Sequence, residues 1–476
     1  MHLRSWPWQS LAIIALFSVP AAKADPAPKP PTTFDVAAID EYLGKQVASN
    51  GYIGLSVAIV RDGKVVLAKG YGKRSLKPEA AVETATPFAA GSVTKQFTCA
   101  CILLLAEDGK LSVRDPVAKW YPDLTKAKEI TLYDLMTHAA GYPDYYPLDF
   151  VDRRMEKPIP PDDLLKEYAG SKLDFDPGAR WSYSNTGFIL LGRIVEKVSG
   201  KPFAEFLAEQ ILKPLKMANT SFDPKPGADG LAIGYTAFAL GDPEPAAREA
   251  EGWIHAAGGL YTTPSDLAKW DVALVSGKVL KPDAYRLMTA TRELNDGRTR
   301  DYGCGIGVVR RSGETVLRHS GAVSGFLAYN AVFPRTRSAV VLMSNCDHLD
   351  AGDMNDLLVD LLLKTQPPAA ADVPKVSGPA AKEAAIDMLH QLQTGEVKRD
   401  NLGEEYSHYL TAERVQGAKQ RLGPLGEPES VELDPAYERG GMEVVKVHFT
   451  FKTLKMKAMM YRTPDGKMQQ FLLYKS

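Results

Sequence analysis

The sequence has 476 residues and a formal net charge of −1 at pH 7, with 45% hydrophobic and 24% charged residues. This length is enough for two or three domains, and the composition is that of an ordinary globular protein. A nearly neutral chain lacks the basic surface that binds nucleic acids or anionic membranes, so we expect neither as a partner. No spacing of His and Cys residues is typical of a metal site, so we expect no metal and no cofactor.

The first 24 residues are typical of a secretory signal peptide. Residues 11–22 form a short apolar stretch, and Ala22-Lys23-Ala24 is an A-x-A cleavage site. The stretch is too short for a membrane span, and no cysteine follows the cut to carry a lipid. We therefore expect a periplasmic or secreted protein without a stable membrane anchor, which begins with a flexible lead-in over residues 25–34.

Strand signals occur at both ends of the region 35–365. Near its start, two apolar runs flank Asp62-Gly63, a strong hairpin signal. Near its end, short apolar runs separated by turns predict strands at residues 304–310, 316–319, 326–333 and 339–343. Helical periodicity lies between the two ends, for example at residues 185–199, where Gly200 is the stop signal. This order predicts an α+β domain with one antiparallel sheet built from both termini, flanked by helices, and with a helical subdomain beside it.

A second, smaller domain is predicted after a linker. Residues 366–380 are rich in Pro, Ala, Gly and Ser, which is typical of a linker. Residues 381–476 combine a helical pattern with alternating apolar and basic residues, which predicts a small α+β domain with an antiparallel sheet. We expect the lysine and arginine side chains of these strands to form a solvated sheet face.

Ser92-Val93-Thr94-Lys95 is the only Ser-x-x-Lys in the chain, and it stands at the start of a long apolar run. Such a pattern arises by chance about once or twice in a chain of this length. Here, however, the apolar run predicts a buried central helix that places Lys95 beside the Ser92 hydroxyl. A serine needs a neighbouring base to become a nucleophile, and a buried ammonium needs a partner or a role. The pair is therefore a candidate nucleophile and base.

Two further motifs are unique in the chain. Tyr183-Ser184-Asn185 precedes a predicted helix, where the plain structural interpretation is that Ser184 caps the helix. His319-Ser320-Gly321 is predicted to end a strand, with the glycine at a bulge or turn.

In this order, the three motifs resemble the signature of serine β-lactamases and penicillin-binding proteins, whose third motif is Lys-Thr-Gly or a His-x-Gly variant. The resemblance covers residues 35–365 and is closest to the class C β-lactamase-like branch, which includes esterases, D-amino-acid peptidases and carboxypeptidases. The smaller unit is similar to α+β domains that follow some of these hydrolases, which implies no activity.

The resemblance implies roles for the motif residues. Ser92 would attack the acyl carbon, Lys95 would hold or accept its proton, and Tyr183 would relay a proton to the leaving group. Asn185 would orient Lys95 or the substrate, and His319 would take the place of the usual lysine. The backbone N–H groups of Ser92 and Ala322 would form the oxyanion hole, and Ser320 and Gly321 would bind the substrate. Whether Lys95 or Tyr183 is the base stays open at this point.

The histidine in the third motif departs from the usual pattern. A lysine keeps its charge at neutral pH, whereas an ordinary histidine titrates near pH 6.5, so His319 should leave an inflection near that pH. This weakens the case for efficient β-lactam turnover and favours ester or amide hydrolysis. Of the remaining candidates, His138 is interpreted as a turn-stabilising residue, and Cys304 and Cys346 are a candidate disulfide pair.

These motifs lead to one principal hypothesis and several alternatives. The first is an exported serine hydrolase that cleaves an ester or amide of a small-molecule or peptide substrate through a Ser92 acyl-enzyme. The alternatives with the same fold are a D-amino-acid peptidase or carboxypeptidase that acts on peptidoglycan-type peptides, and a weak β-lactamase. The third hypothesis is a catalytically weak penicillin-binding-type protein, which would bind ligands without an adduct.

Overall fold

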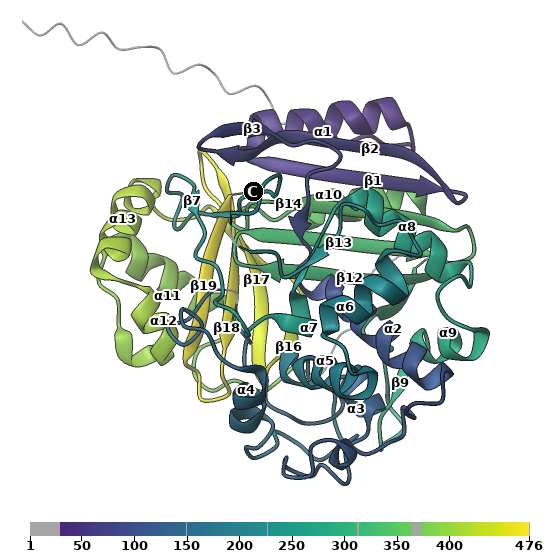
Figure 1. Ribbon diagram of the computed structural model, residues 1–476. Coiled ribbons are helices and arrows are strands. Elements are labelled where there is room, and N and C mark those ends of the chain that lie inside the picture. The colour runs from purple at the N-terminus through teal and green to yellow at the C-terminus, as the bar shows by residue number, and fades with distance from the viewer. Residues whose placement is uncertain (1–28, 149, 226, 312–313, 364–372, 476) are drawn as a thin grey trace, which may run out of the picture.

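The computed structural model describes residues 29–148, 150–225, 227–311, 314–363 and 373–475. Two antiparallel sheets organise it, one of seven strands with helices on both faces and one of five strands near the C-terminus (Figure 1). The predicted α+β class, with antiparallel sheets flanked by helices, is confirmed. The predicted signal peptide lies outside the described residues.

The seven-stranded sheet is assembled from both ends of the N-terminal unit (residues 29–363), in the order β11-β12-β13-β14-β1-β2-β3. Its strands are β1 (Gly54–Arg61), β2 (Lys64–Leu76), β3 (Glu79–Ala81), β11 (Gly307–Arg311), β12 (Glu314–Val323), β13 (Phe326–Phe333) and β14 (Ser338–Ser344). The turn at Asp62-Gly63 joins β1 to β2 as predicted. Strand β14 pairs with β1, with Val57 opposite Leu342, and this pairing joins the two halves of the sequence.

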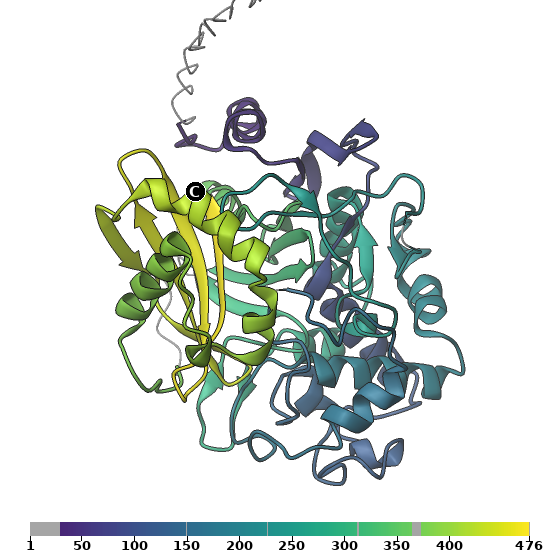
Figure 2. The same ribbon diagram turned by 90° about the vertical axis from the view of Figure 1, so that its left-hand side faces the viewer.

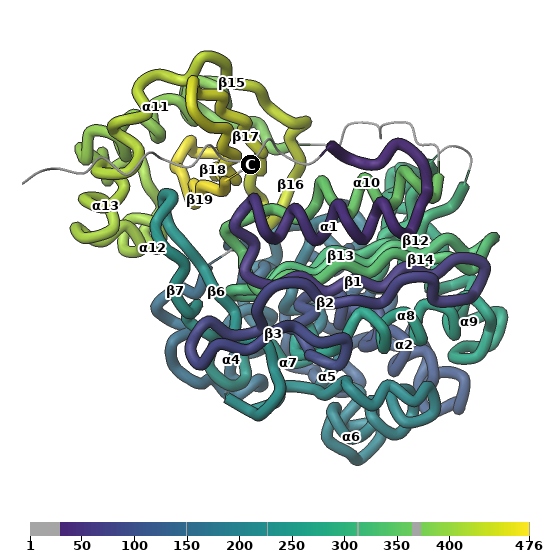
Figure 3. Tube along the Cα trace, turned by 90° about the horizontal axis from the view of Figure 1, so that it is seen from above, coloured from purple at the N-terminus to yellow at the C-terminus, as the bar shows by residue number. Residues whose placement is uncertain are grey.

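Helices cover both faces of this sheet. Successive side chains of a strand point to opposite faces, and the central strands β1 and β14 are apolar and buried on both. Helices α1 (Val36–Asn50) and α10 (Gly352–Leu362) pack on one face, where Val57 and Ile59 meet Leu43 and Leu358 (Figure 3). The opposite face packs against a second cluster that contains α2 (Thr94–Glu107), α5 (Asn185–Ser199) and α8 (Pro264–Val275).

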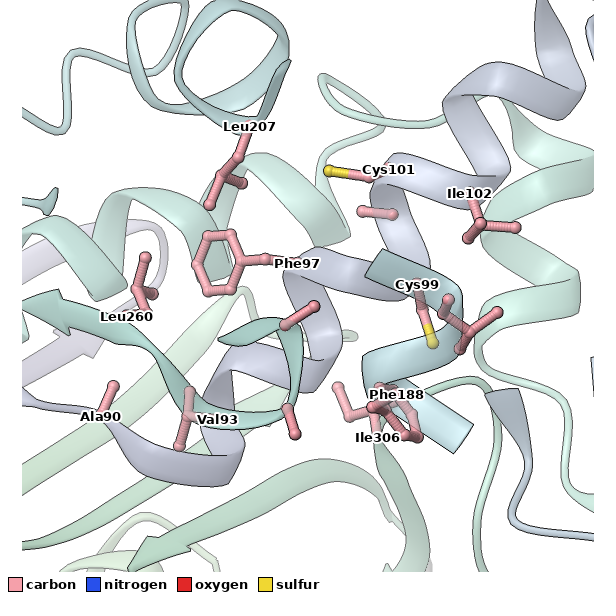
Figure 4. Packing of buried hydrophobic residues seen from close by; sticks show 14 of the residues in the cluster. Ala90, Val93, Phe97, Cys99, Cys101, Ile102, Phe188, Leu207, Leu260 and Ile306 are labelled. Atoms are coloured by element: carbon pink, nitrogen blue, oxygen red, sulfur yellow. The ribbon is translucent and has the colours of Figure 1, made fainter. Parts of the chain in front are cut away.

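Helix α2 lies at the centre of the second cluster. Phe97, Cys99 and Ile102 are fully buried and lie among Leu260, Phe188 and Leu207 from other segments (Figure 4). The ring of Phe97 stacks on Trp270 of α8, with centroids 4.2 Å apart. A helix that is buried along most of its length is held rigidly by its surroundings, and α2 therefore fixes the position of the Ser92–Lys95 motif at its start.

The remaining elements of the N-terminal unit are short. The helices are α3 (Leu132–Met136), α4 (Pro161–Tyr168), α6 (Phe203–Leu207), α7 (His255–Gly258) and α9 (Pro282–Met288), with single turns at η1 (Gly91–Val93), η2 (Val117–Lys119) and η3 (Ala208–Leu212). The small strands are β4 (Phe88–Ala89), β5 (Ser221–Phe222), β6 (Tyr235–Thr236), β7 (Glu244–Pro245), β8 (Leu260–Thr262), β9 (Arg292–Glu293) and β10 (Thr299–Arg300).

The C-terminal unit (residues 381–475) has its own sheet and core. Its helices and turns are α11 (Ala381–Thr394), η4 (Arg399–Asn401), α12 (Glu404–Tyr409), α13 (Ala412–Leu422) and η5 (Gly423–Leu425), and its strands are β15 (Ser430–Leu433), β16 (Tyr437–Arg439), β17 (Met442–Thr450), β18 (Lys455–Arg462) and β19 (Met468–Lys475). The helices cover the outer face of the sheet, and the other face turns toward the N-terminal unit (Figures 1 and 2).

The expectation of a solvated basic face on this sheet is wrong. Lys446 forms an ion pair with Asp350 at 2.7 Å, and Lys457 pairs with Asp353, so β17 and β18 place these two lysines against the acidic start of α10. Leu148 and Phe150 of the N-terminal unit also belong to the apolar core of the C-terminal unit. Sequence periodicity marks one face as basic, but it carries no information on what covers that face.

The cysteines and the motif strand also differ from expectation. All four cysteines are free, and Cys304 and Cys346 lie in separate apolar clusters. His319 lies in the middle of β12, which continues to Val323 because Gly321 pairs with Ala328 of β13.

Two kinds of feature are absent from the described ranges. No helix there is long and apolar enough to cross a membrane. Within the same ranges, no group of three or more His, Cys, Asp or Glu residues is placed to hold a metal ion.

The Asp350–Lys446 pair should contribute to stability in a pH-dependent way. Burial alone would raise the pKa of Asp350, but Lys446 and the N–H of Gly352 outweigh burial and lower it to about 2, from 3.8. A lowered carboxyl pKa stabilises the fold above pH 3.8, and this stabilisation disappears as the pH falls toward 2. We expect Asp350→Asn to lower the free energy of unfolding by about 2 kcal/mol at pH 7, and by less at pH 3.

Urea denaturation at the two pH values measures this difference. The matched control is Asp40→Asn, which removes a more exposed ion pair with Lys69 and should cost less than about 1 kcal/mol. Equal losses for Asp350→Asn at pH 7 and pH 3 would show that the pair does not act through its charge.

Candidate active site

Ser92 and Lys95 lie where the chain enters helix α2. Ser92 is in the turn η1, and the fully buried Lys95 lies in the first turn of α2. The Lys95 Nζ is 3.0 Å from Ser92 Oγ, 2.7 Å from Asn185 Oδ1 and 2.8 Å from the carbonyl oxygen of Ala257. These three oxygens use the three donors of an ammonium group, so the amine is held in one position next to the serine.

The environment of Lys95 favours its neutral form. Burial lowers its pKa to about 7, because a low-dielectric surrounding penalises the charged amine. The carboxylate of Asp144 acts in the opposite direction, and the guanidinium of Arg439 adds to the lowering. Near neutral pH, a substantial fraction of Lys95 is therefore a free amine beside the Ser92 hydroxyl.

Asn185 is oriented by Asp144. The Asp144 carboxylate accepts the backbone N–H of Asn185 at 3.0 Å and its Nδ2–H at 3.0 Å. Since Nδ2 donates to Asp144, Oδ1 must face Lys95. Ser184 was expected to cap α5, but its side chain makes no capping hydrogen bond. Asp144 instead accepts the first backbone N–H of this helix.

The Tyr183 phenol is a neutral acid in this site. Burial raises its pKa far above the ordinary value, and the nearby Ser92 side chain opposes only part of this shift. The buried hydroxyl has no hydrogen-bond partner among the described residues. The ring lies 4.9 Å from Lys95 Nζ. At neutral pH Tyr183 therefore has a proton to donate.

His319 is the last member of a buried hydrogen-bond chain. The backbone N–H of Ser184 donates to Nδ1 of His138 at 3.1 Å, so the proton of neutral His138 is on Nε2. That nitrogen lies 3.3 Å from the Tyr302 hydroxyl, which in turn lies 2.8 Å from Nε2 of His319. His319 Nδ1–H donates to the carbonyl of Ser320 at 2.5 Å, which leaves Nε2 to accept from Tyr302. All the donors in this chain point the same way.

The expectation that His319 titrates near pH 6.5 is wrong. Burial, together with the positive charge of Lys95, lowers the pKa of His319 to about 3. The histidine is therefore neutral throughout the physiological range and supplies no cation. The interpretation of His138 as a turn-stabilising residue agrees with its left-handed backbone (φ 54°) and its bond to Ser184.

Two glycines allow the backbone of β12 to approach the turn that contains Ser92. A Cβ on Gly321 would lie 2.0 Å from the carbonyl oxygen of Ala90, and one on Gly91 would lie 2.8 Å from the nitrogen of Ala322. Gly91 also has a left-handed backbone (φ 50°). Gly321 is therefore required because β12 passes close to the backbone at Ala90, and not because of the predicted bulge or turn. This close approach places the Ala322 nitrogen next to η1. Ser320 is exposed on the strand and lines the cavity described next.

These residues line a cavity of about 1090 Å³ that runs between the two units. Ser92, Tyr183 and His319 form part of its wall, and Tyr437, Arg439 and Tyr461 of the C-terminal unit form another part. Five of the residues predicted from the motifs thus come together: Ser92, Lys95, Tyr183, Asn185 and His319. Sequence reasoning missed Asp144 and Arg439, because each lies in a loop or hairpin without a recognisable pattern.

Comparison with known proteins identifies the family. The Beta-lactamase family profile matches residues 39–364, which is more than half of the chain. The chain belongs to the Beta-lactamase family. The putative penicillin-binding protein PbpX of Bacillus subtilis (strain 168) is 28% identical over 333 residues, which are 68% of this chain and 78% of that protein.

Two solved structures illustrate the likeness of fold. A D-stereospecific amidohydrolase from Streptomyces sp. is 26% identical, with a TM-score of 0.58 over 70% of this chain and 100% of that chain. The octameric penicillin-binding protein homologue from Pyrococcus abyssi has a TM-score of 0.63 over 92% of this chain and 100% of that chain. At 22% identity, the second likeness is one of fold alone.

Removal of the Tyr302 hydroxyl should weaken both the fold and the site. Tyr302→Phe leaves the Nε2 atoms of two buried histidines without their shared partner. We expect a loss of about 1–3 kcal/mol in the free energy of unfolding, measured by urea denaturation. The control is Tyr285→Phe, at a tyrosine of α9 that is not part of this hydrogen-bond chain, and it should cost less than about 1 kcal/mol. Equal losses in the two variants would contradict the proposed hydrogen-bond chain.

Proposed function

We propose that this member of the Beta-lactamase family is a serine hydrolase that cleaves an ester or amide through an acyl-enzyme on Ser92. The observation that carries the proposal is the contact between Ser92 Oγ and the buried amine of Lys95, whose pKa is about 7. A base with a pKa near the working pH is the most effective in general base catalysis. Tyr183 keeps its proton in the same range, so Lys95 is assigned as the base.

The reaction then follows in two balanced steps. Lys95 takes the proton of Ser92 while Ser92 Oγ bonds to the acyl carbon, and the bond to the leaving nitrogen or oxygen breaks. Tyr183 gives its proton to the leaving group and is reprotonated from Lys95. In the second step, water attacks the acyl carbon, its proton returns through the same groups to Ser92, and the carboxylic acid is released. The backbone N–H groups of Ser92 and Ala322 are assigned to the oxyanion, each worth roughly 3 kcal/mol in such sites.

A D-amino-acid amide or peptide is the second candidate substrate. The D-stereospecific amidohydrolase from Streptomyces sp. is 26% identical to this chain, over 70% of this chain and the whole of the amidohydrolase. This likeness favours an amide of a D-amino acid over a β-lactam. A peptidoglycan-type peptide belongs to the same class of substrate. Export through the predicted signal peptide would give access to it, and N-terminal sequencing of the mature protein tests for cleavage after Ala24.

The acyl-enzyme is tested by trapping it. We expect a fluorophosphonate to add one adduct to the native protein, on Ser92, and Ser92→Ala to abolish it; intact-mass measurement and peptide mapping detect both results. The same measurement with a penicillin, and the turnover of D- and L-phenylalanine amides, separate the candidates. An adduct that persists in Ser92→Ala, or folded protein that binds substrate without any adduct, would contradict the proposal.

The pH dependence of labelling tests the assignment of the base. Because Lys95 must be neutral to accept a proton, the rate of fluorophosphonate labelling should rise with pH and level off above an inflection near pH 7. Lys95→Arg cannot become neutral, and it should be at least about 100-fold slower throughout. The inflection should persist in His319→Asn, since His319 is already neutral there. An inflection that disappears in that variant would assign the titration to the histidine.

A further inference from the structure

The C-terminal unit places one side chain beside the catalytic tyrosine. Strands β16 and β17 form a hairpin whose tip, Gly440-Gly441, packs against the N-terminal unit: a Cβ on Gly440 would lie 2.8 Å from the Cβ of Pro147. The residue before this tip is Arg439. Its Cζ lies 6.0 Å from the centre of the Tyr183 ring, and the side chain lines the cavity that contains Ser92.

A buried contact fixes the hairpin at this position. The carboxylate of Glu438 accepts a hydrogen bond from the Ser182 hydroxyl at 2.7 Å and one from the N–H of Gly441 at 2.8 Å. Ser182 immediately precedes Tyr183, and Glu438 immediately precedes Arg439. The Ser182–Glu438 hydrogen bond therefore holds Tyr183 and Arg439, the residues that follow, close to each other. On its other side, Arg439 donates a hydrogen bond to the Tyr461 hydroxyl at 2.9 Å.

The charge of Arg439 acts on the site itself. It adds to the burial that lowers the pKa of Lys95, and it opposes the burial that raises the pKa values of Tyr183 and Asp144. An arginine remains charged at any pH at which a protein folds, whereas His319 is neutral in the physiological range and Lys95 is partly neutral. A permanent cation is thus present beside Tyr183, although the third motif does not supply one.

We propose that Arg439 binds a carboxylate on the leaving-group side of the substrate, so that the C-terminal unit determines specificity for an acidic substrate such as a peptide with a free C-terminus. This inference rests on the proposed function of the Ser92 site. Guanidinium groups bind carboxylates through paired, charge-assisted hydrogen bonds. The leaving-group side follows from geometry, because Arg439 lies beside Tyr183, the residue assigned to protonate the leaving group.

The test measures binding in the Ser92→Ala background, where no turnover is needed. The two probes are N-acetyl-D-alanyl-D-alanine and the same dipeptide amidated at its C-terminus, and calorimetry gives the ratio of their Kd values. We expect the free acid to bind about 10- to 100-fold more tightly than the amide, and Arg439→Gln to remove this preference. Arg439→Lys should keep part of it because it keeps the charge.

The matched control is Arg421→Gln, which removes another arginine that joins the two units, through the carbonyl oxygen of Ala239, outside the cavity wall. It should leave the preference for the acid unchanged. Equal affinity for acid and amide, or a preference that survives Arg439→Gln, overturns the inference. An equal loss of affinity for both probes in Arg439→Gln overturns it too, since it would assign Arg439 a structural role. Absence of a fluorophosphonate adduct in the native protein would instead contradict only the proposed hydrolysis.

Discussion

The contact between the buried Lys95 amine and Ser92 is the interaction on which the rest of the site depends. A buried ammonium is costly unless its donors are satisfied, and here three oxygens from three segments surround it. Helix α2 supplies Lys95, α5 supplies Asn185 and α7 supplies the carbonyl of Ala257. The rigid packing of α2 and α5 therefore also sets the geometry of the Ser92–Lys95 pair, and burial lowers the pKa of the amine toward neutrality.

Around this contact, the protein controls where protons and charges are placed. Burial and the charge of Lys95 keep His319 neutral, and Asp144 turns the Asn185 oxygen toward Lys95. Tyr183 retains its proton because it is buried. A partly neutral amine, a protonated phenol and a neutral histidine thus lie side by side, and Arg439 of the C-terminal unit adds a permanent positive charge beside Tyr183. Hydrolytic chemistry and substrate choice would then be divided between the two units.

Much of the fold followed from local patterns in the sequence. The Asp62-Gly63 turn, the helix ended by Gly200 and the strand at residues 326–333 occur as predicted, because turn chemistry and periodicity act over a few neighbouring residues. The length of β12 did not follow, since His319 continues the strand only through its pairing with β13. The acidic partners of Lys446 and Lys457 were also missed, because Asp350 and Asp353 lie about 100 residues away in the sequence.

The sequence by itself determined the family, the α+β class and the five motif residues Ser92, Lys95, Tyr183, Asn185 and His319, because each motif stands at a recognisable position of a helix or strand. Only the tertiary structure decided their protonation states and their further partners. A pKa depends on burial and on charges brought close in space, and neither is written in local sequence. The same reason explains Asp144 and Arg439: each is an ordinary charged residue in the sequence, and the fold places both beside Lys95.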